Sequence, residues 1–166
     1  MAKFLVGLAI VAFTSFCGFA LAKKYRVRKQ FFAQFYEFND RFLSEVNYFK
    51  RPIAEVCKRF SYRGEFDLLL TGFLKKREEY GEKMGTFTAL DLREFHFLTA
   101  DEQSFIGDYF LTIGRSDTHS QKAYFGAAKE KLAEWQKSSE ENCKKYGDLY
   151  LKLGFLCGLA ILILIV

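Results

Sequence analysis

Ser116, Asp117 and His119 are the residue types that form the nucleophile, the orienting acid and the general base of a hydrolase triad. They lie in the stretch GRSDTHSQ, residues 114–121. Triad side chains point at one another across a site, and neighbours at positions i, i+1 and i+3 of one turn cannot do so. Helix capping explains the stretch better, with Gly114 ending one helix and Ser116 or Asp117 beginning the next.

The remaining sequence holds few groups for catalysis. His96 and His119 are the only histidines, and neither lies in HExxH or beside a carboxylate pair at ligand spacing, so we expect structural histidines and no metal or cofactor. The phosphate-binding and nucleophile-elbow patterns GxxxxGK[ST], GxGxxG and GxSxG are absent. The four cysteines show no CxxC spacing and are expected to be free thiols. A membrane-bound enzyme whose site combines scattered carboxylates with the two histidines remains the alternative.

Both ends of the chain are apolar. Residues 4–22 carry no charge and would span about 28 Å as a helix, close to the thickness of a bilayer's hydrocarbon core. The second uncharged run, 153–166, reaches a comparable length if the span begins at Leu149 and Lys152 extends back to the headgroups. The sequence therefore predicts transmembrane helices at 1–22 and 149–166, joined by a domain at 23–148.

The residues after the first span favour its retention over cleavage. Ala20-Leu21-Ala22 has the small-x-small spacing of a signal-peptidase site, which would give an exported protein. The apolar run is longer than a signal peptide's, however, and positive charge beside a span stays cytoplasmic. We therefore predict a two-pass protein with a cytoplasmic centre. The membrane-proximal basic cluster behind this prediction comprises Lys23, Lys24, Arg26, Arg28 and Lys29.

The charge of the central region indicates which partners to expect. Cations directly beside a span meet anionic headgroups, so the basic cluster predicts contact with the lipid bilayer. Residues 30–148 contain 18 lysines and arginines against 20 aspartates and glutamates. This near balance of positive and negative charge argues against a nucleic-acid-binding surface.

Helical periodicity predicts an all-α fold. One apolar stripe recurs at spacings of three and four, in a helix that continues the first span: Phe31, Phe35, Phe38, Phe42, Val46 and Phe49. Pro52 breaks this helix, and a short helix to Ser61, closed by Gly64, is expected to follow.

Shorter elements are expected in the middle of the chain. Residues 66–74 are apolar, and the charged stretch 75–85 is predicted to be an exposed elbow. Residues 88–98 resemble another short helix. Thr99-Ala100-Asp101-Glu102 has the pattern of a capping box, and the helix it begins should end at Gly114.

A last long helix should continue into the second span without a break. Its expected apolar face comprises Phe125, Ala128, Leu132, Trp135, Cys143, Tyr146 and Leu153. Two long helices that both continue into the membrane predict an antiparallel two-helix stalk that carries a helical bundle. Gly154 and Gly158 form a GxxxG in the second span and could pack against Gly7 or Gly18 of the first.

Several segments in this order resemble the stage III sporulation protein AB family from end to end. They are the first span with its basic residues, VNYFKRPIAEV, IGRSDTHSQ and the terminal YLKLGFLCGLAILILIV. Gly114, Ser116, Asp117 and Gln121 match the family's LGxSDxxxQ pattern, and the last stretch matches its LGxLxGL pattern. Ile113 departs from the usual leucine, and Arg51 and Ile53 replace threonine and leucine around Pro52.

The resemblance implies a component of the sporulation channel complex between mother cell and forespore, in the mother-cell-derived membrane. Members of this family are similar to the inner-membrane platform proteins of type II secretion and type IV pilus machines. The implied partners are the secretion-type ATPase of the assembly and other channel membrane subunits, and the protein could also form a homo-oligomer. The expected function is that of a non-enzymatic adaptor.

Overall fold

The computed structural model describes residues 2–48, 55, 59–80, 92–113 and 118–165. Its regular elements are all helices, and the described residues include no strand, which confirms the all-α prediction. Contacts divide the chain into two units: unit 1 comprises Met1–Lys29 with Lys137–Val166, and unit 2 comprises Gln30–Gln136.

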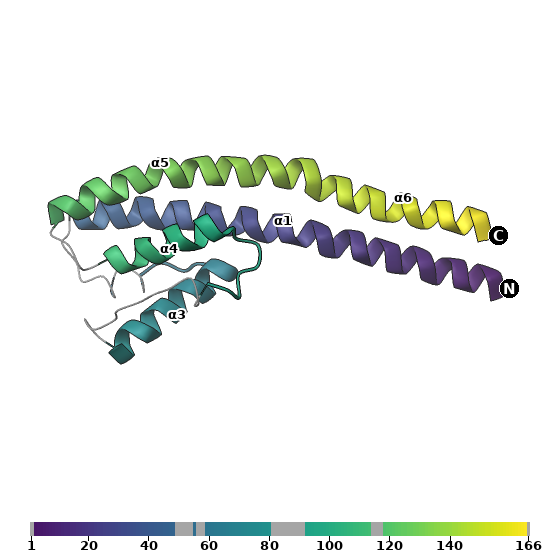
Figure 1. Ribbon diagram of the computed structural model, residues 1–166, viewed down its shortest axis with the longest axis horizontal. Helices are drawn as coiled ribbons and strands as arrows, with labels where there is room; N and C mark the ends of the chain where they lie inside the picture. Colours follow the sequence, from purple (N-terminus) through teal and green to yellow (C-terminus); the bar gives the residue numbers. More distant parts are fainter. Residues whose placement is uncertain (1, 49–54, 56–58, 81–91, 114–117, 166) are drawn as a thin grey trace. The chain divides into compact units, whose positions relative to one another are not determined.

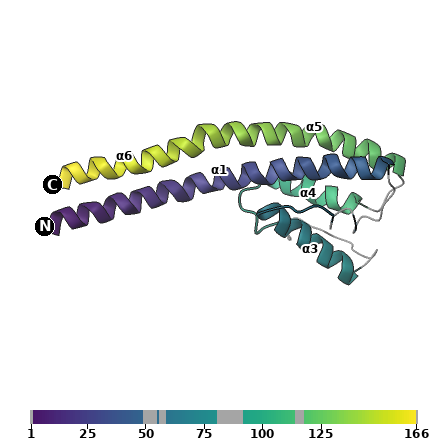
Figure 2. The same cartoon turned by 180° about the vertical axis from the view of Figure 1, so that it is seen from behind.

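The long helix α1 (Ala2–Tyr48) contributes to both units, as does α5 (Thr118–Asn142). A π-helical turn, η2 (Cys143–Gly147), and α6 (Asp148–Ile165) follow α5 with no intervening loop. Unit 2 also contains α3 (Glu65–Tyr80) and α4 (Ala100–Thr112). Figures 1 and 2 show α1 and α5 side by side in this unit.

Aromatic rings build the core of unit 2. Phe31, Phe35, Phe38 and Phe42 of α1 are buried, as the stripe predicts, whereas the side chain of Val46 and the whole of Phe49 lie outside the described residues. The rings of Phe35 and Tyr109 lie 4.8 Å apart edge to face, a favourable arrangement for aromatic pairs. Rings of α1, α3, α4 and α5 meet here, among them Phe66 and Phe73 of α3, Phe110 of α4 and Phe125 of α5.

The capping box at the start of α4 is confirmed. The Thr99 hydroxyl accepts a hydrogen bond from the Glu102 amide at 3.3 Å, and the Glu102 carboxylate accepts one from the Thr99 amide at 2.8 Å. The last residue of α4 is Thr112, and Ile113 caps it through its amide. Gly114, where the sequence places the end, lies outside the described residues.

Two predictions for the middle of the chain are wrong. Lys75–Tyr80 belongs to α3 and is not an elbow; the rest of the expected elbow, 81–85, is not described. Residues 92–98, expected as a helix, instead form turns with hydrogen bonds from Phe95 to Leu92 and from Leu98 to Phe95. Leu92, Phe95 and Leu98 are buried at a spacing of three, which suits tight turns as well as an α-helix.

Gly64 begins a helix and does not close one. Residues 61–63 have no regular structure, and the Gly64 carbonyl accepts the first hydrogen bond of α3 from the Leu68 amide at 3.2 Å. Its φ of 64° lies in the left-handed region, which glycine adopts without strain. Of the short helix expected over 52–61, the structure describes Glu55 and Arg59 as helical.

The side chain of Gln34 holds the segment that precedes Gly64. Its amide nitrogen donates to the Arg63 carbonyl at 2.7 Å, and its carbonyl oxygen accepts from the Arg63 amide at 2.5 Å. This reciprocal pair satisfies two backbone groups of a non-helical segment, so α1 holds the segment that leads into α3.

Unit 1 is an antiparallel pair of helices. Figure 1 shows both chain ends together at one end of this pair. Leu162 near the C-terminus lies over Gly7, and Tyr150 and Gly154 lie beside Gly18. The predicted continuation of the last long helix into the second apolar run is confirmed, because α5, η2 and α6 follow one another without a loop. The expected periodicity does not carry through, because the π turn η2 interrupts the α-helical pattern.

Candidate functional site

The two helices of unit 1 approach each other through glycines. A Cβ atom added at Gly154 would lie 2.8 Å from the Thr14 carbonyl oxygen and 3.0 Å from the Gly18 Cα. One added at Gly158 would lie 2.9 Å from the Val11 Cα. Contacts this short leave no room for a side chain, so the two backbones pack as closely as in small-residue pairs of membrane helices.

The outer surface of unit 1 is apolar. Phe13 and Phe16 are 68% and 67% exposed, and other large side chains of α1 and α6 are exposed beside them: Val6, Leu8, Phe19, Leu21, Leu149, Leu153, Phe155, Leu156, Ile161, Ile163 and Leu164. Two helices, within Val6–Glu45 and Lys122–Leu164, are long and apolar enough to cross a membrane by length and composition. Exposure of such a surface to water is unfavourable, whereas its contact with lipid hydrocarbon is not. The surface is therefore compatible with a membrane location.

The membrane-proximal basic cluster lies on α1 just after this apolar surface. Lys23, Lys24 and Arg26 are exposed, and Arg28 and Lys29 are partly buried. The Lys29 ammonium lies 3.7 Å from the Glu140 carboxylate, which also lies 3.3 Å from that of Lys144. Lys144 first, and Lys29 second, lower the pKa of Glu140. One acid therefore joins cations of both helices.

A stack of tyrosines lies at the same level of unit 1. The ring of Tyr25 lies 5.6 Å from that of Tyr146 and 5.9 Å from that of Tyr150, with interplanar angles of 30° and 19°. Lys145 lies over the Tyr146 ring at 5.0 Å. Tyrosines and lysines are enriched at the headgroup level of membrane proteins. Sequence reasoning missed this stack, although its tyrosines flank the two apolar runs.

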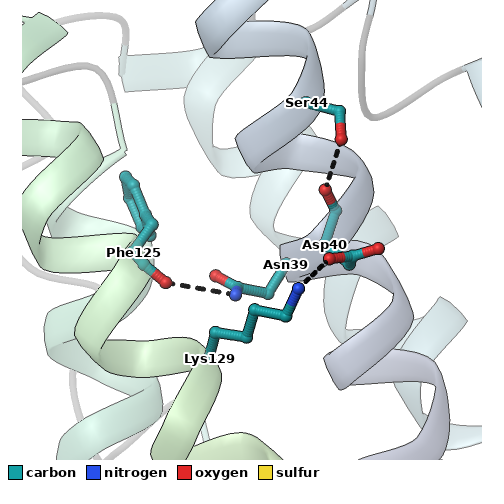
Figure 3. Close-up of polar contacts among 5 residues, drawn as sticks. All are labelled: Asn39, Asp40, Ser44, Phe125 and Lys129. Carbon is teal, nitrogen blue, oxygen red and sulfur yellow. Dashed lines mark hydrogen bonds and ion pairs between the residues drawn. The ribbon is translucent and has the colours of Figure 1, made fainter.

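A buried polar contact joins three helices of unit 2. Asn39 is fully buried among phenylalanine rings, and its side-chain amide donates to the Phe125 carbonyl of α5 at 3.2 Å (Figure 3). The hydroxyl of Tyr109, on α4, donates to the other end of the Asn39 side chain at 2.9 Å. Because buried polar groups need partners, these bonds favour one register of α1 against α4 and α5.

An ion pair on the surface beside Asn39 joins the same two long helices. The Lys129 ammonium of α5 donates to the Asp40 carboxylate of α1, and both side chains are about half exposed (Figure 3). The hydrogen bond with Asp40 raises the pKa of Lys129. Exposed pairs contribute little to stability, so Asn39 is the more important determinant of this contact.

The structure describes only part of the stretch that holds the hydrolase-type residues. Gly114, Ser116 and Asp117 lie outside the described residues, and Gln121 lies in the first turn of α5. His96 is exposed in the turns that precede α4, while His119 lies in α5. Over the described part of the chain, no group of three or more His, Cys, Asp and Glu side chains is placed to hold a metal ion.

The residue that precedes the stretch 114–121 is fixed by burial and by one hydrogen bond. Ile113 is buried, and its carbonyl accepts a hydrogen bond from the Arg77 guanidinium of α3 at 3.4 Å. The end of α4 is therefore tied to α3 at the point where the family pattern begins.

No curated protein and no solved structure matches the chain significantly. A family model does match, over residues 3–166, and its description is stage III sporulation protein AB. It spans both apolar ends, the basic cluster and the helical unit between them. The chain therefore belongs to the stage III sporulation protein AB family and is a sporulation-associated protein.

Proposed function

We propose that this protein is a non-enzymatic platform of the sporulation channel complex. In this proposal α1 and α6 cross the membrane derived from the mother cell, and the helices of unit 2 bind a cytoplasmic secretion-type ATPase. The spans then contact other membrane subunits of the channel. The family match supports the role in sporulation, and the apolar surface of unit 1 supports the membrane location.

One observation carries the proposal beyond family membership. Helical structure runs without a loop from Ala2 to Tyr48, and again from Thr118 to Ile165. Each of the two long helical segments has one end in the aromatic core of unit 2 and the other in the glycine-packed pair of unit 1. A displacement that the ATPase imposes on unit 2 would therefore reach the membrane through helices rather than through flexible linkers.

The binding step is tested with the full chain in detergent. The tagged protein is incubated with the ATPase of the same assembly, with and without ATP, and the bound fraction is measured. We expect the ATPase to be captured. A matched control is an unrelated two-span protein that carries the same tag. If the folded chain captures no more ATPase than this control does, direct docking is refuted.

The absence of catalysis is tested by replacing the groups an enzyme would need. We expect the triple variant His96→Ala, Asp117→Ala and His119→Ala to sporulate within about twofold of the parent, because an adaptor needs these residues only for folding. Folding is checked by the fluorescence of Trp135, the only tryptophan, which packs between Phe32 and Phe105. Loss of sporulation with normal fluorescence would favour an enzyme.

A further inference from the structure

The π turn η2 adds one residue to the helix that enters the second apolar run. Its five residues lie between Asn142 and Asp148, whose backbone angles are right-handed helical (φ −63°, ψ −38° and φ −73°, ψ −33°). The chain thus remains helical on both sides. A π turn of this kind is one residue inserted into an α-helix, and it rotates everything beyond it by about 100°.

The buried residues of unit 1 reveal this rotation. Gly158 is buried, and a Cβ atom added there would lie 2.9 Å from the Val11 Cα, so this side of α6 faces α1. Ser139, before the turn, is also buried, at 2% exposure. In an unbroken α-helix Ser139 and Gly158 would point about 100° apart. If the one residue that the π turn adds is left out of the rotation, the two residues face the same side.

The exposure of Leu153 indicates the same rotation of α6. It lies fourteen residues after Ser139, so an unbroken α-helix would place the two within about 40° of each other. Instead Leu153 is 44% exposed, and the adjacent Gly154 faces the backbone of Gly18. The side of α6 that packs on α1 is therefore rotated by one residue, about 100°, from the side that an unbroken continuation of α5 would turn toward α1.

We propose that η2 is a register device that selects the glycine side of α6 for packing on α1. If the same residues formed an unbroken α-helix without the π turn, α6 would turn Leu153 toward α1. A leucine cannot fit where an added Cβ at Gly154 would already lie 2.8 Å from the Thr14 carbonyl. The two backbones would have to separate. The close pair in unit 1 thus depends on five residues outside the glycine contact, and this inference is independent of the proposed ATPase.

Deletion and insertion within η2 test the device in opposite directions. The full chain in membranes carries alanine at Cys17, Cys57, Cys143 and Cys157, together with Tyr25→Cys and Tyr150→Cys, whose native rings lie 5.9 Å apart. A short bis-maleimide measures their proximity. Deleting Lys145 removes the extra residue, so the segment can become a regular α-helix that keeps position 150 in place. We expect cross-linking within about twofold of the parent.

Inserting one alanine after Lys145 adds a second extra residue and rotates α6 by a further 100° or so. We expect the cross-link between positions 25 and 150 to fall roughly tenfold, and Leu149→Cys to become the residue that cross-links with Tyr25→Cys. An insertion and a deletion at the same position then have different effects, which ordinary disruption of a helix would not produce.

A control pair lies before the turn. Lys29→Cys and Glu140→Cys replace groups 3.7 Å apart and should cross-link in every variant, which reports that α1 and α5 remain paired. If deletion of Lys145 moves the cross-link from position 150 to Leu151→Cys, the π turn persists without setting the register, and the proposal is overturned. Equal loss after deletion and insertion, with the control pair intact, would overturn it as well.

Discussion

Asn39 shows how much one polar residue contributes to a core of phenylalanines. Its side chain contacts α5 through the Phe125 carbonyl and α4 through the Tyr109 hydroxyl. Phenylalanine rings can slide past one another at little expense, whereas two directional hydrogen bonds in a dry core are satisfied in only one arrangement. At the residue scale, Asn39 is the feature that makes this packing specific.

Replacing Asn39 by leucine should destabilise unit 2 by about 1–3 kcal/mol, because it removes the buried hydrogen bonds that Asn39 makes with the Tyr109 hydroxyl and the Phe125 carbonyl. The measurement is urea unfolding of the full chain in detergent, followed by Trp135 fluorescence. Adding Tyr109→Phe to Asn39→Leu should recover part of the loss, since both ends of the bond between positions 39 and 109 are then apolar.

The matched control for this prediction is Ser44→Ala on the same helix. Ser44 is exposed and its hydroxyl donates to the Asp40 carbonyl at 3.0 Å (Figure 3). Its loss should change the free energy of unfolding by less than about 0.5 kcal/mol. A change as large as that of Asn39→Leu would show that burial of the amide is not the cause.

Glu140 should give unit 1 a small sensitivity to acid. Its pKa is lowered by Lys144 and Lys29, so the ion pairs stabilise the folded state at pH above the ordinary carboxyl value. This contribution is lost as the pH falls through the lowered pKa. We expect the thermal midpoint of the parent to exceed that of Glu140→Gln at neutral pH and the two to converge in acid. A difference that persists at low pH would contradict the ion-pair explanation.

At the scale of the elements, the glycines differ according to what lies next to them. Gly154 has backbone atoms of α1 within 3.0 Å of an added Cβ, whereas Gly126 of α5 has nothing within 4 Å. Glycine is a poor helix former, so it is expected inside a helix only where close packing compensates for its low propensity. Gly154 has such compensation in unit 1, and Gly126 has none among the described residues.

The variants Gly154→Ala and Gly126→Ala should therefore have opposite effects. The first should lower the thermal midpoint of the full chain in detergent, because the two backbones of unit 1 must separate. The second should leave the midpoint unchanged or raise it, because alanine favours a helix over glycine by up to about 1 kcal/mol of free energy. Circular dichroism on heating measures both. An increase with Gly154→Ala would show that α1 and α6 are not closely packed.

At the scale of the whole molecule, the proposed topology predicts which residues are reached from outside the cell. Leu68 of α3 is 62% exposed in unit 2. A cysteine there, in a background without native cysteines, should resist a membrane-impermeant maleimide in intact cells and react after permeabilisation. Lys3→Cys serves as the control and should react in both cases. Labelling of Leu68→Cys in intact cells would refute a cytoplasmic unit 2 and remove the ATPase from its reach.

The helices themselves could be predicted from the sequence, because their causes are local. Apolar runs at the chain ends, the spacing of Phe31 to Phe42 and the capping box at Thr99 depend on residues a few positions apart. The family match covers residues 3–166. Local rules failed over 92–98, where a spacing of three residues suits tight turns as well as a helix.

Only the tertiary structure decided which residues meet. Asn39 has the same spacing as its apolar neighbours on α1, and its burial became evident once Tyr109 and Phe125, distant in sequence, were placed beside it. Leu153 continues the upstream periodicity but is exposed, because η2 inserts a residue and turns Gly154 toward α1. Sequence periodicity determines the faces of a helix only while the helix remains regular, whereas long-range contacts determine which face is buried.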